Sequence, residues 1–98
     1  LQISGTTEEV MALEPLRAKF ESFGFCVREV DGNDVAALCS VLKEVPFEKG
    51  RPSLVIAHTI KGKGVSFMEN QVQWHHAVPT DEQFRQAILE LENERMAL

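Results

Sequence analysis

The chain has 98 residues, which suits one small domain or a piece of a larger one. It carries 15 acidic and 10 basic residues, and the net charge of −5 argues against general binding to nucleic acids or to anionic membranes. Hydrophobic residues make up 44% of the sequence, which argues against disorder. No apolar run approaches the ~18 residues of a membrane span.

The first residues are neither a signal peptide nor a natural initiation site, since no methionine precedes Met11. We therefore expect the chain to be part of a larger polypeptide, either cut or processed. Cys26 and Cys39 both stand among apolar neighbours, which predicts two buried, reduced thiols. No Cys/His spacing matches a zinc site, and no feature indicates an oxidising compartment, so a cytoplasmic location is expected.

Residues 1–14 combine a short apolar start with a polar loop. A helix is predicted from Pro15, because a proline suits the first helical turn, where its missing N–H has no partner in any case. Apolar residues then recur at i, i+4 and i+7 from Leu16 to Phe23, as on one face of a helix. Gly24 is placed to end this helix in a left-handed conformation.

Residues 25–30 form a short β-rich run that predicts a strand. The next four residues have turn chemistry, and Asn33 or Asp34 can cap the following helix. That helix is indicated by apolar residues at i, i+3 and i+7 from Val35, and Pro46 breaks it.

Residues 53–59 contain a continuous apolar run at 54–57 rather than an alternating pattern, which is typical of a strand buried on both faces of a parallel sheet. Residues 60–79 are a long irregular stretch, and such loops in compact domains are often functional. The segment at 80–83, Thr-Asp-Glu-Gln, fits a capping box at the start of a last helix. The glutamates of that helix are expected on its solvated side: Glu90, Glu92 and Glu94.

The predicted order is helix, strand, helix, strand, long loop, helix. This alternation indicates an α/β fold with a parallel sheet. Two strands, or three if residues 1–3 add one, are too few for a stable open sheet of this kind. The fold is therefore expected to be incomplete on its own, with the missing strands upstream.

Ligands of open parallel sheets bind beyond the carboxyl ends of the strands, where the chain enters residues 60–64. Gly62 and Gly64 allow the backbone to approach a ligand closely, and Lys61 and Lys63 add positive charge that suits an anion such as a phosphate. The spacing is not that of a Walker motif. The alternative is a solvated loop without a ligand.

The second candidate site is the segment Trp74 to His76 at the end of the long loop. Histidines titrate near neutral pH, so His75 and His76 could transfer a proton or hydrogen-bond a polar substrate. Adjacent histidines seldom bind one metal together, and the alternative is a pair of surface or satisfied core histidines. His58, at the end of the buried strand, could equally be structural or face a site.

Five segments of the sequence, at 14–16, 23–25, 30–34, 57–70 and 74–75, resemble those of the transketolases, in particular the N-terminal subunit of split transketolases. The similarity covers essentially the whole chain in order and spacing. Related thiamine diphosphate enzymes such as deoxyxylulose-phosphate synthase carry a similar lysine–glycine loop, but the Phe-Met-Glu-Asn continuation at 67–70 favours transketolase.

The resemblance implies that residues 1–98 are the C-terminal portion of the domain that grips the diphosphate of thiamine diphosphate. The implied reaction transfers a two-carbon ketol unit between sugar phosphates. It also implies Mg²⁺ or Ca²⁺, a dimer, and two partners: the remainder of the N-terminal section and a C-terminal, pyrimidine-binding section or subunit. The alternatives are a non-catalytic α/β fragment that binds a partner or an anion, and a related thiamine diphosphate enzyme.

Site residues follow from the resemblance one position at a time. His75 matches a catalytic histidine near substrate and cofactor, although His76 stands where the family has glycine. The cofactor-binding positions are Leu1, Lys61, Gly62 and Gly64. Ser4 stands where aspartate is usual. The family's metal-binding Gly-Asp-Gly motif and its asparagine have no match, so no metal ligand is expected among these residues.

Overall fold

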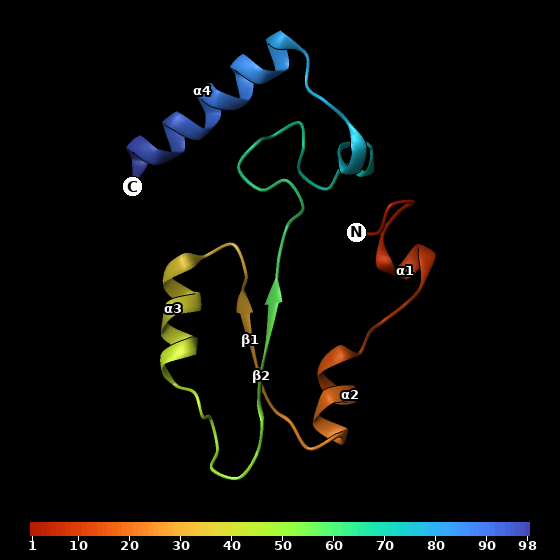
Figure 1. Ribbon diagram of the computed structural model, residues 1–98, viewed down its shortest axis with the longest axis vertical. Helices are drawn as coiled ribbons and strands as arrows, with labels where there is room; N and C mark the ends of the chain where they lie inside the picture. The colour runs from red at the N-terminus through yellow and green to blue at the C-terminus, as the bar shows by residue number, and fades with distance from the viewer. The chain divides into compact units, whose positions relative to one another are not determined.

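The computed structural model describes residues 1–98, which form two compact units (Figure 1). Residues 11–59 make one unit, here called the sheet unit. Residues 1–10 and 60–98 make the other, here called the loop unit. Each unit has its own elements and is described by itself.

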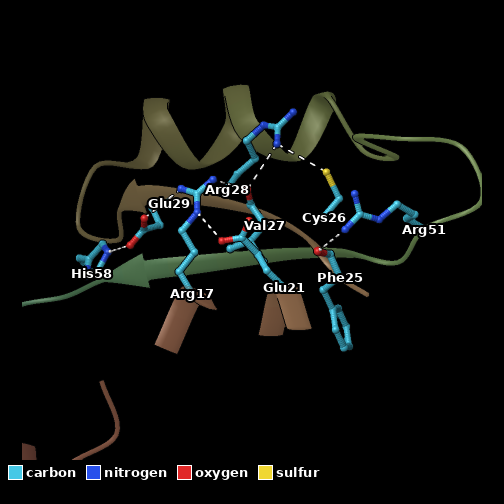
Figure 2. Close-up of polar contacts among 9 residues, drawn as sticks. All are labelled: Arg17, Glu21, Phe25, Cys26, Val27, Arg28, Glu29, Arg51 and His58. Atoms are coloured by element: carbon cyan, nitrogen blue, oxygen red, sulfur yellow. Dashed lines mark hydrogen bonds and ion pairs between the residues drawn. The ribbon is translucent and has the colours of Figure 1, made fainter. Parts of the chain in front are cut away.

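The sheet unit holds two parallel strands, β1 (Cys26–Asp31) and β2 (Ser53–His58). The strands pair in register from Cys26 opposite Ser53 to Asp31 opposite His58. Parallel neighbours need a crossover, and α3 (Val35–Lys43) supplies it. The helix α2 (Leu16–Ser22) lies on the other side of the strand pair from α3, as both views show (Figures 1 and 2). The predicted α/β order and parallel sheet are confirmed.

Local chemistry sets the end of α2 and the start of α3 as the sequence predicts, whereas Pro15, expected in the first turn of α2, is its N-cap residue with an extended backbone at φ −81° and ψ 111°. Gly24 has φ +96° just after the end of α2, in the region that favours glycine. Of the two candidate caps for α3, Asp34 takes the role, and its Oδ1 accepts a hydrogen bond from the amide of Ala37 at 3.0 Å. Instead, the backbone N–H of Asn33 donates to Asp31 Oδ1 at 2.9 Å, and this bond forms the turn.

The loop unit contains α1 (Thr7–Val10), the 3₁₀ helix η1 (Val72–His76) and the long helix α4 (Asp81–Ala97). The predicted capping box of α4 is present, since Thr80 and Gln83 exchange both side-chain-to-backbone hydrogen bonds. The expectation of an irregular stretch at 60–79 needs one correction, because η1 forms within it. None of the helices is both long and apolar enough to cross a membrane.

Two features at the start of the chain differ from the sequence predictions. Residues 1–3 add no strand to the sheet, because Gln2 pairs only with Gly5 in an isolated antiparallel bridge. The short helix α1 was not predicted. Its start has a capping pattern, in which the Thr6 amide and hydroxyl both donate to Glu9 Oε2, at 2.9 and 2.8 Å. The hydrogen bond from the Thr6 backbone amide has the larger effect on the pKa of Glu9, and that from the Thr6 hydroxyl the next; both lower it.

The buried core is small. Only three apolar side chains are buried: Val27, Val65 and Ala87. On α3, Val35 and Leu42 belong to the predicted apolar face, yet they are 72% and 59% exposed. Apolar faces left open in this way are expected of part of a domain whose other layers lie elsewhere.

The cysteines need a correction for the same reason. Both are free thiols, but Cys26 is only half-buried and Cys39 is exposed on α3. An apolar neighbourhood in sequence predicts burial only where a second surface covers it. On α3 no such surface covers Cys39, so its burial was wrongly predicted.

Candidate functional site

Residues 60–71, here called the glycine loop, close on themselves. The backbone amide of Asn70 donates to the backbone carbonyl of Lys61 at 2.9 Å, and this bond joins the two ends of the loop. Gly62 has φ +76°, and a Cβ at this position would lie 2.6 Å from the carbonyl oxygen of Met68. Only glycine fits this close approach of two backbone segments. Gly62 is therefore the point on which closure of the loop depends.

The two lysines of the loop differ in their partners. Lys63 Nζ lies 3.9 Å from Glu69 Oε1, and the same carboxylate oxygen accepts from the amide of Gly64 at 3.2 Å. Lys61 takes part in no ion pair within the chain, and its side chain is exposed. Of the two candidate anion-binding lysines, Lys61 is therefore the one whose charge is not already balanced.

The loop is anchored on α4 by Ser66, whose amide and hydroxyl both donate to Glu90, at 2.7 and 2.6 Å. The Ser66 hydroxyl, then its amide, and then the side chain of Gln86 lower the pKa of Glu90. Glu90 was expected merely on the solvated side of the helix; it is half-buried there, and the expectation missed its contact with Ser66. Nothing in a single sequence indicates a contact between residues 24 positions apart.

The 3₁₀ helix η1 is held against the loop through Trp74. The indole Nε1 donates to the carbonyl of Phe67 at 3.0 Å, and the two rings lie 5.5 Å apart, tilted by 55°. This contact fixes the turn that carries His75 and His76. Asn70 is the only residue other than glycine with a positive φ, so the backbone at His76 is one that a side chain tolerates.

A narrow cavity of about 10 Å³, the room for about one water molecule, lies between the chain start, the loop and η1. It brings together three residues that the sequence singled out, Leu1, Lys61 and His75. Gly62 and Gly64 shape the loop but do not line the cavity. The remaining lining residues, which the sequence did not indicate, are Gln2, Gln71 and Val72.

The histidine pair therefore faces two different places. His75 lines the narrow cavity and also an open hollow of about 330 Å³ formed with Ala77 and Val78. His76 lines only the open hollow. Lys61 and His75 are both exposed and line the same small cavity, so a cation and an imidazole lie at one place on the surface. Together the two side chains can bind an anionic group there and hydrogen-bond or protonate an oxygen beside it.

His58 belongs to a polar network of the sheet unit (Figure 2). Its Nε2 lies 2.9 Å from Glu29 Oε1, and the other oxygen of that carboxylate accepts from Arg17 at 3.0 Å. Arg17 also binds Glu21 and the carbonyl of Val27, and so joins α2 to β1. The hydrogen bond from His58, and then that from Arg17, lower the pKa of Glu29.

This network gives His58 a structural role that joins β2 to β1. Arg17 and Glu29 were not singled out from the sequence. The only signal was the i, i+4 spacing of Arg17 and Glu21, which predicts a pair on one helix face but not its link to a strand. No three His, Cys, Asp or Glu side chains lie close enough together to hold a metal ion.

A family model and the most similar curated proteins all indicate the same family. Residues 1–94 match the family model described as the thiamine diphosphate binding domain of transketolase. The chain is 46% identical over 91 residues to one subunit of the apulose-4-phosphate transketolase of Phocaeicola vulgatus, a match that covers 93% of this chain and 32% of the relative. The subunit with the same name from Actinobacillus succinogenes is 39% identical over 94 residues.

A third relative is 6-deoxy-6-sulfo-D-fructose transketolase subunit SqwG of a Clostridium species, which is 38% identical over 94 residues. The last two matches each cover 96% of this chain and 34% of the relative. The chain thus spans about a third of the length of these curated relatives.

Proposed function

Because the chain belongs to the transketolase family, within its thiamine diphosphate binding domain, we propose that it is the C-terminal portion of that domain in a working transketolase. The assembled enzyme transfers a two-carbon ketol unit from a ketose phosphate to an aldose phosphate. The observation that carries the proposal is the cavity at which Lys61 and His75 meet, formed by residues inside the family match. The chain alone is expected to be inactive.

The cavity itself has room for about one water molecule, but the side chains around it include a cation and hydrogen-bond donors, which suit the diphosphate end of the cofactor. The ammonium of Lys61 has no carboxylate partner, so it is free to bind a phosphate oxygen. Gly62 and Gly64 keep the loop backbone compact beside it, and Leu1 adds an apolar wall. Thiamine diphosphate, when bound, supplies the carbon chemistry of ketol transfer.

The role proposed for His75 is to orient the substrate and to hold or move a proton at its oxygen atoms. An imidazole suits this role because it donates and accepts hydrogen bonds near neutral pH. The metal that accompanies the diphosphate, Mg²⁺ or Ca²⁺, is proposed to be bound by residues outside positions 1–98. The chain offers no cluster of ligands for it.

The partners are proposed to be the rest of the N-terminal section and a C-terminal, pyrimidine-binding section or subunit. The relatives are themselves named as single subunits of transketolases, which supports an enzyme of more than one polypeptide. We further propose a dimer, with sugar phosphates as substrates, in the cytoplasm and the pentose phosphate pathway. The net charge of −5 also argues against nucleic acid as a partner.

The test is ketol transfer by the assembled protein with a ketose phosphate donor and an aldose phosphate acceptor. Activity is expected only with thiamine diphosphate and Mg²⁺, should be lost on chelation and gel filtration, and should return when both are restored. Cofactor-dependent condensation of pyruvate with an aldose phosphate, with release of CO2 and without ketol transfer, would instead assign a synthase of the deoxyxylulose-phosphate type. A folded assembly that turns over neither pair would leave a non-catalytic module and contradict the proposal.

A further inference from the structure

The carboxylate of Glu90 on α4 binds the middle of the glycine loop through two donors of one residue. Glu90 Oε2 accepts from the amide of Ser66 at 2.7 Å, and Oε1 accepts from its hydroxyl at 2.6 Å. Gln86, one helical turn earlier, donates to Oε1 at 3.2 Å and fixes the rotation of the carboxylate. Hydrogen bonds to an ionised acceptor are short and about twice as strong as neutral ones.

The loop also lies against the next turn of the same helix. A Cβ on Gly64 would come within 3.2 Å of both Leu91 Cδ2 and Glu94 Oε2. The glycine at this position therefore lets the loop backbone approach α4, while Ser66 anchors it there. Contact and anchor lie within one stretch of α4, residues 90–94.

The anchor can affect Lys61 because the loop is closed. The amide of Asn70 joins the carbonyl of Lys61, and the backbone of Met68 lies against Gly62. A closed loop held at one point moves as a unit, so displacement of Ser66 also displaces Lys61 near the start of the loop. Glu90 itself does not line the cavity at which Lys61 and His75 meet.

We propose that Glu90 is a positioning residue for diphosphate binding: by holding Ser66, it keeps the glycine loop in the conformation that presents Lys61 at the cavity. This inference rests on the function proposed above. It assigns to α4, which contributes no lining residue to that cavity, control over cofactor affinity. Glu90 acts through the loop and has no contact with the reacting atoms.

The test compares Glu90→Gln with the matched control Glu92→Gln in the assembled protein. Glu92 lies on the same helix, but its carboxylate binds only Arg95, at 2.8 Å. The Glu90 change leaves one acceptor oxygen for the two donors of Ser66 and that of Gln86, and is expected to raise the Kd for thiamine diphosphate about tenfold. With saturating cofactor kcat should stay within about twofold, since the reacting groups are unchanged. The control should leave both values unchanged.

Two further measurements separate positioning from general stability. Hydrogen exchange of the Ser66 amide should become about tenfold faster in Glu90→Gln and stay the same in Glu92→Gln. In a Lys61→Ala background, which itself weakens binding, Glu90→Gln should change the Kd by less than about twofold, because the group it positions is gone. Ser66→Ala should weaken binding as Glu90→Gln does, and Ser66→Thr, which keeps both donors, should not.

Faster exchange at Ser66 with an unchanged Kd would show a purely structural contact and overturn the positioning role. The positioning role would also be overturned if the Kd of the double variant rose by the product of the two single-variant increases, those of Glu90→Gln and Lys61→Ala. The behaviour of the unmodified assembly tests the function separately. If that assembly binds no thiamine diphosphate, the proposed function fails with the positioning role, whereas a failure confined to the variants leaves the function standing.

Discussion

Replacing His75 by alanine in the assembled protein is expected to lower kcat for ketol transfer about a hundredfold, the typical contribution of one group that moves a proton or orients the substrate. The Kd for thiamine diphosphate should change much less, because Lys61 and the glycine loop remain. The reason is the place of His75 at the narrow cavity, beside Lys61. Steady-state kinetics at saturating cofactor, together with calorimetric titration of the cofactor, separates the two quantities.

The neighbouring histidine is a matched control for this change. His76 lies on the same 3₁₀ helix and is also exposed, but it lines only the open hollow. His76→Ala should therefore leave kcat within about threefold of the unmodified value. Equal losses in the two variants, or a wild-type kcat in His75→Ala, would show that His75 has been given the wrong role.

Gly62→Ala is expected to open the glycine loop. A residue with a side chain at φ +76° costs about 1–2 kcal/mol. The new Cβ would also lie 2.6 Å from Met68 O, and that backbone cannot give way without breaking the closure between Asn70 and Lys61. We expect a total cost of about 3 kcal/mol, in line with strained backbone positions of this kind. The exchange of the Asn70 amide should accelerate about a hundredfold as a result.

Gly50→Ala isolates the contribution of the backbone angle. Gly50 has φ +83°, but a Cβ there would meet nothing within 4 Å, and the residue lies in the sheet unit. This variant should lose stability locally and leave the Asn70 amide and cofactor binding unchanged. If the Asn70 backbone amide exchanged its hydrogen no faster in Gly62→Ala than in Gly50→Ala, the contact of residue 62 with Met68 would not control closure of the loop.

The sequence allowed the order of elements and most helix ends to be predicted, because these depend on neighbouring residues. Gly24 and Asp34 are examples, since a left-handed angle and a side-chain cap need only a few adjacent positions. The helix α1 was missed although Thr6 and Glu9 have the spacing of a capping box. It is a single turn with no apolar stripe, so periodicity gave no signal there.

The parts that could not be predicted depend on contacts distant in sequence. From their residue types alone Lys61 and Lys63 looked alike as loop cations, although the resemblance had singled out Lys61, and only the structure pairs Lys63 with Glu69. Glu90 looked like any solvated glutamate of α4 until Ser66 was placed against it. The burial of Cys39 was wrongly predicted because composition cannot tell whether another layer covers an apolar helix face.

The measurement that tests the account most directly is a structure of the assembled protein with thiamine diphosphate and Mg²⁺ bound. The quantities of interest are the shortest distances from Lys61 Nζ and from the His75 ring nitrogens to the diphosphate oxygens. We expect Lys61 Nζ to lie within about 3 Å of a diphosphate oxygen, with His75 at the same end of the cofactor. A diphosphate bound elsewhere, with both side chains separated from it by other residues, would contradict the assignment of this loop and cavity.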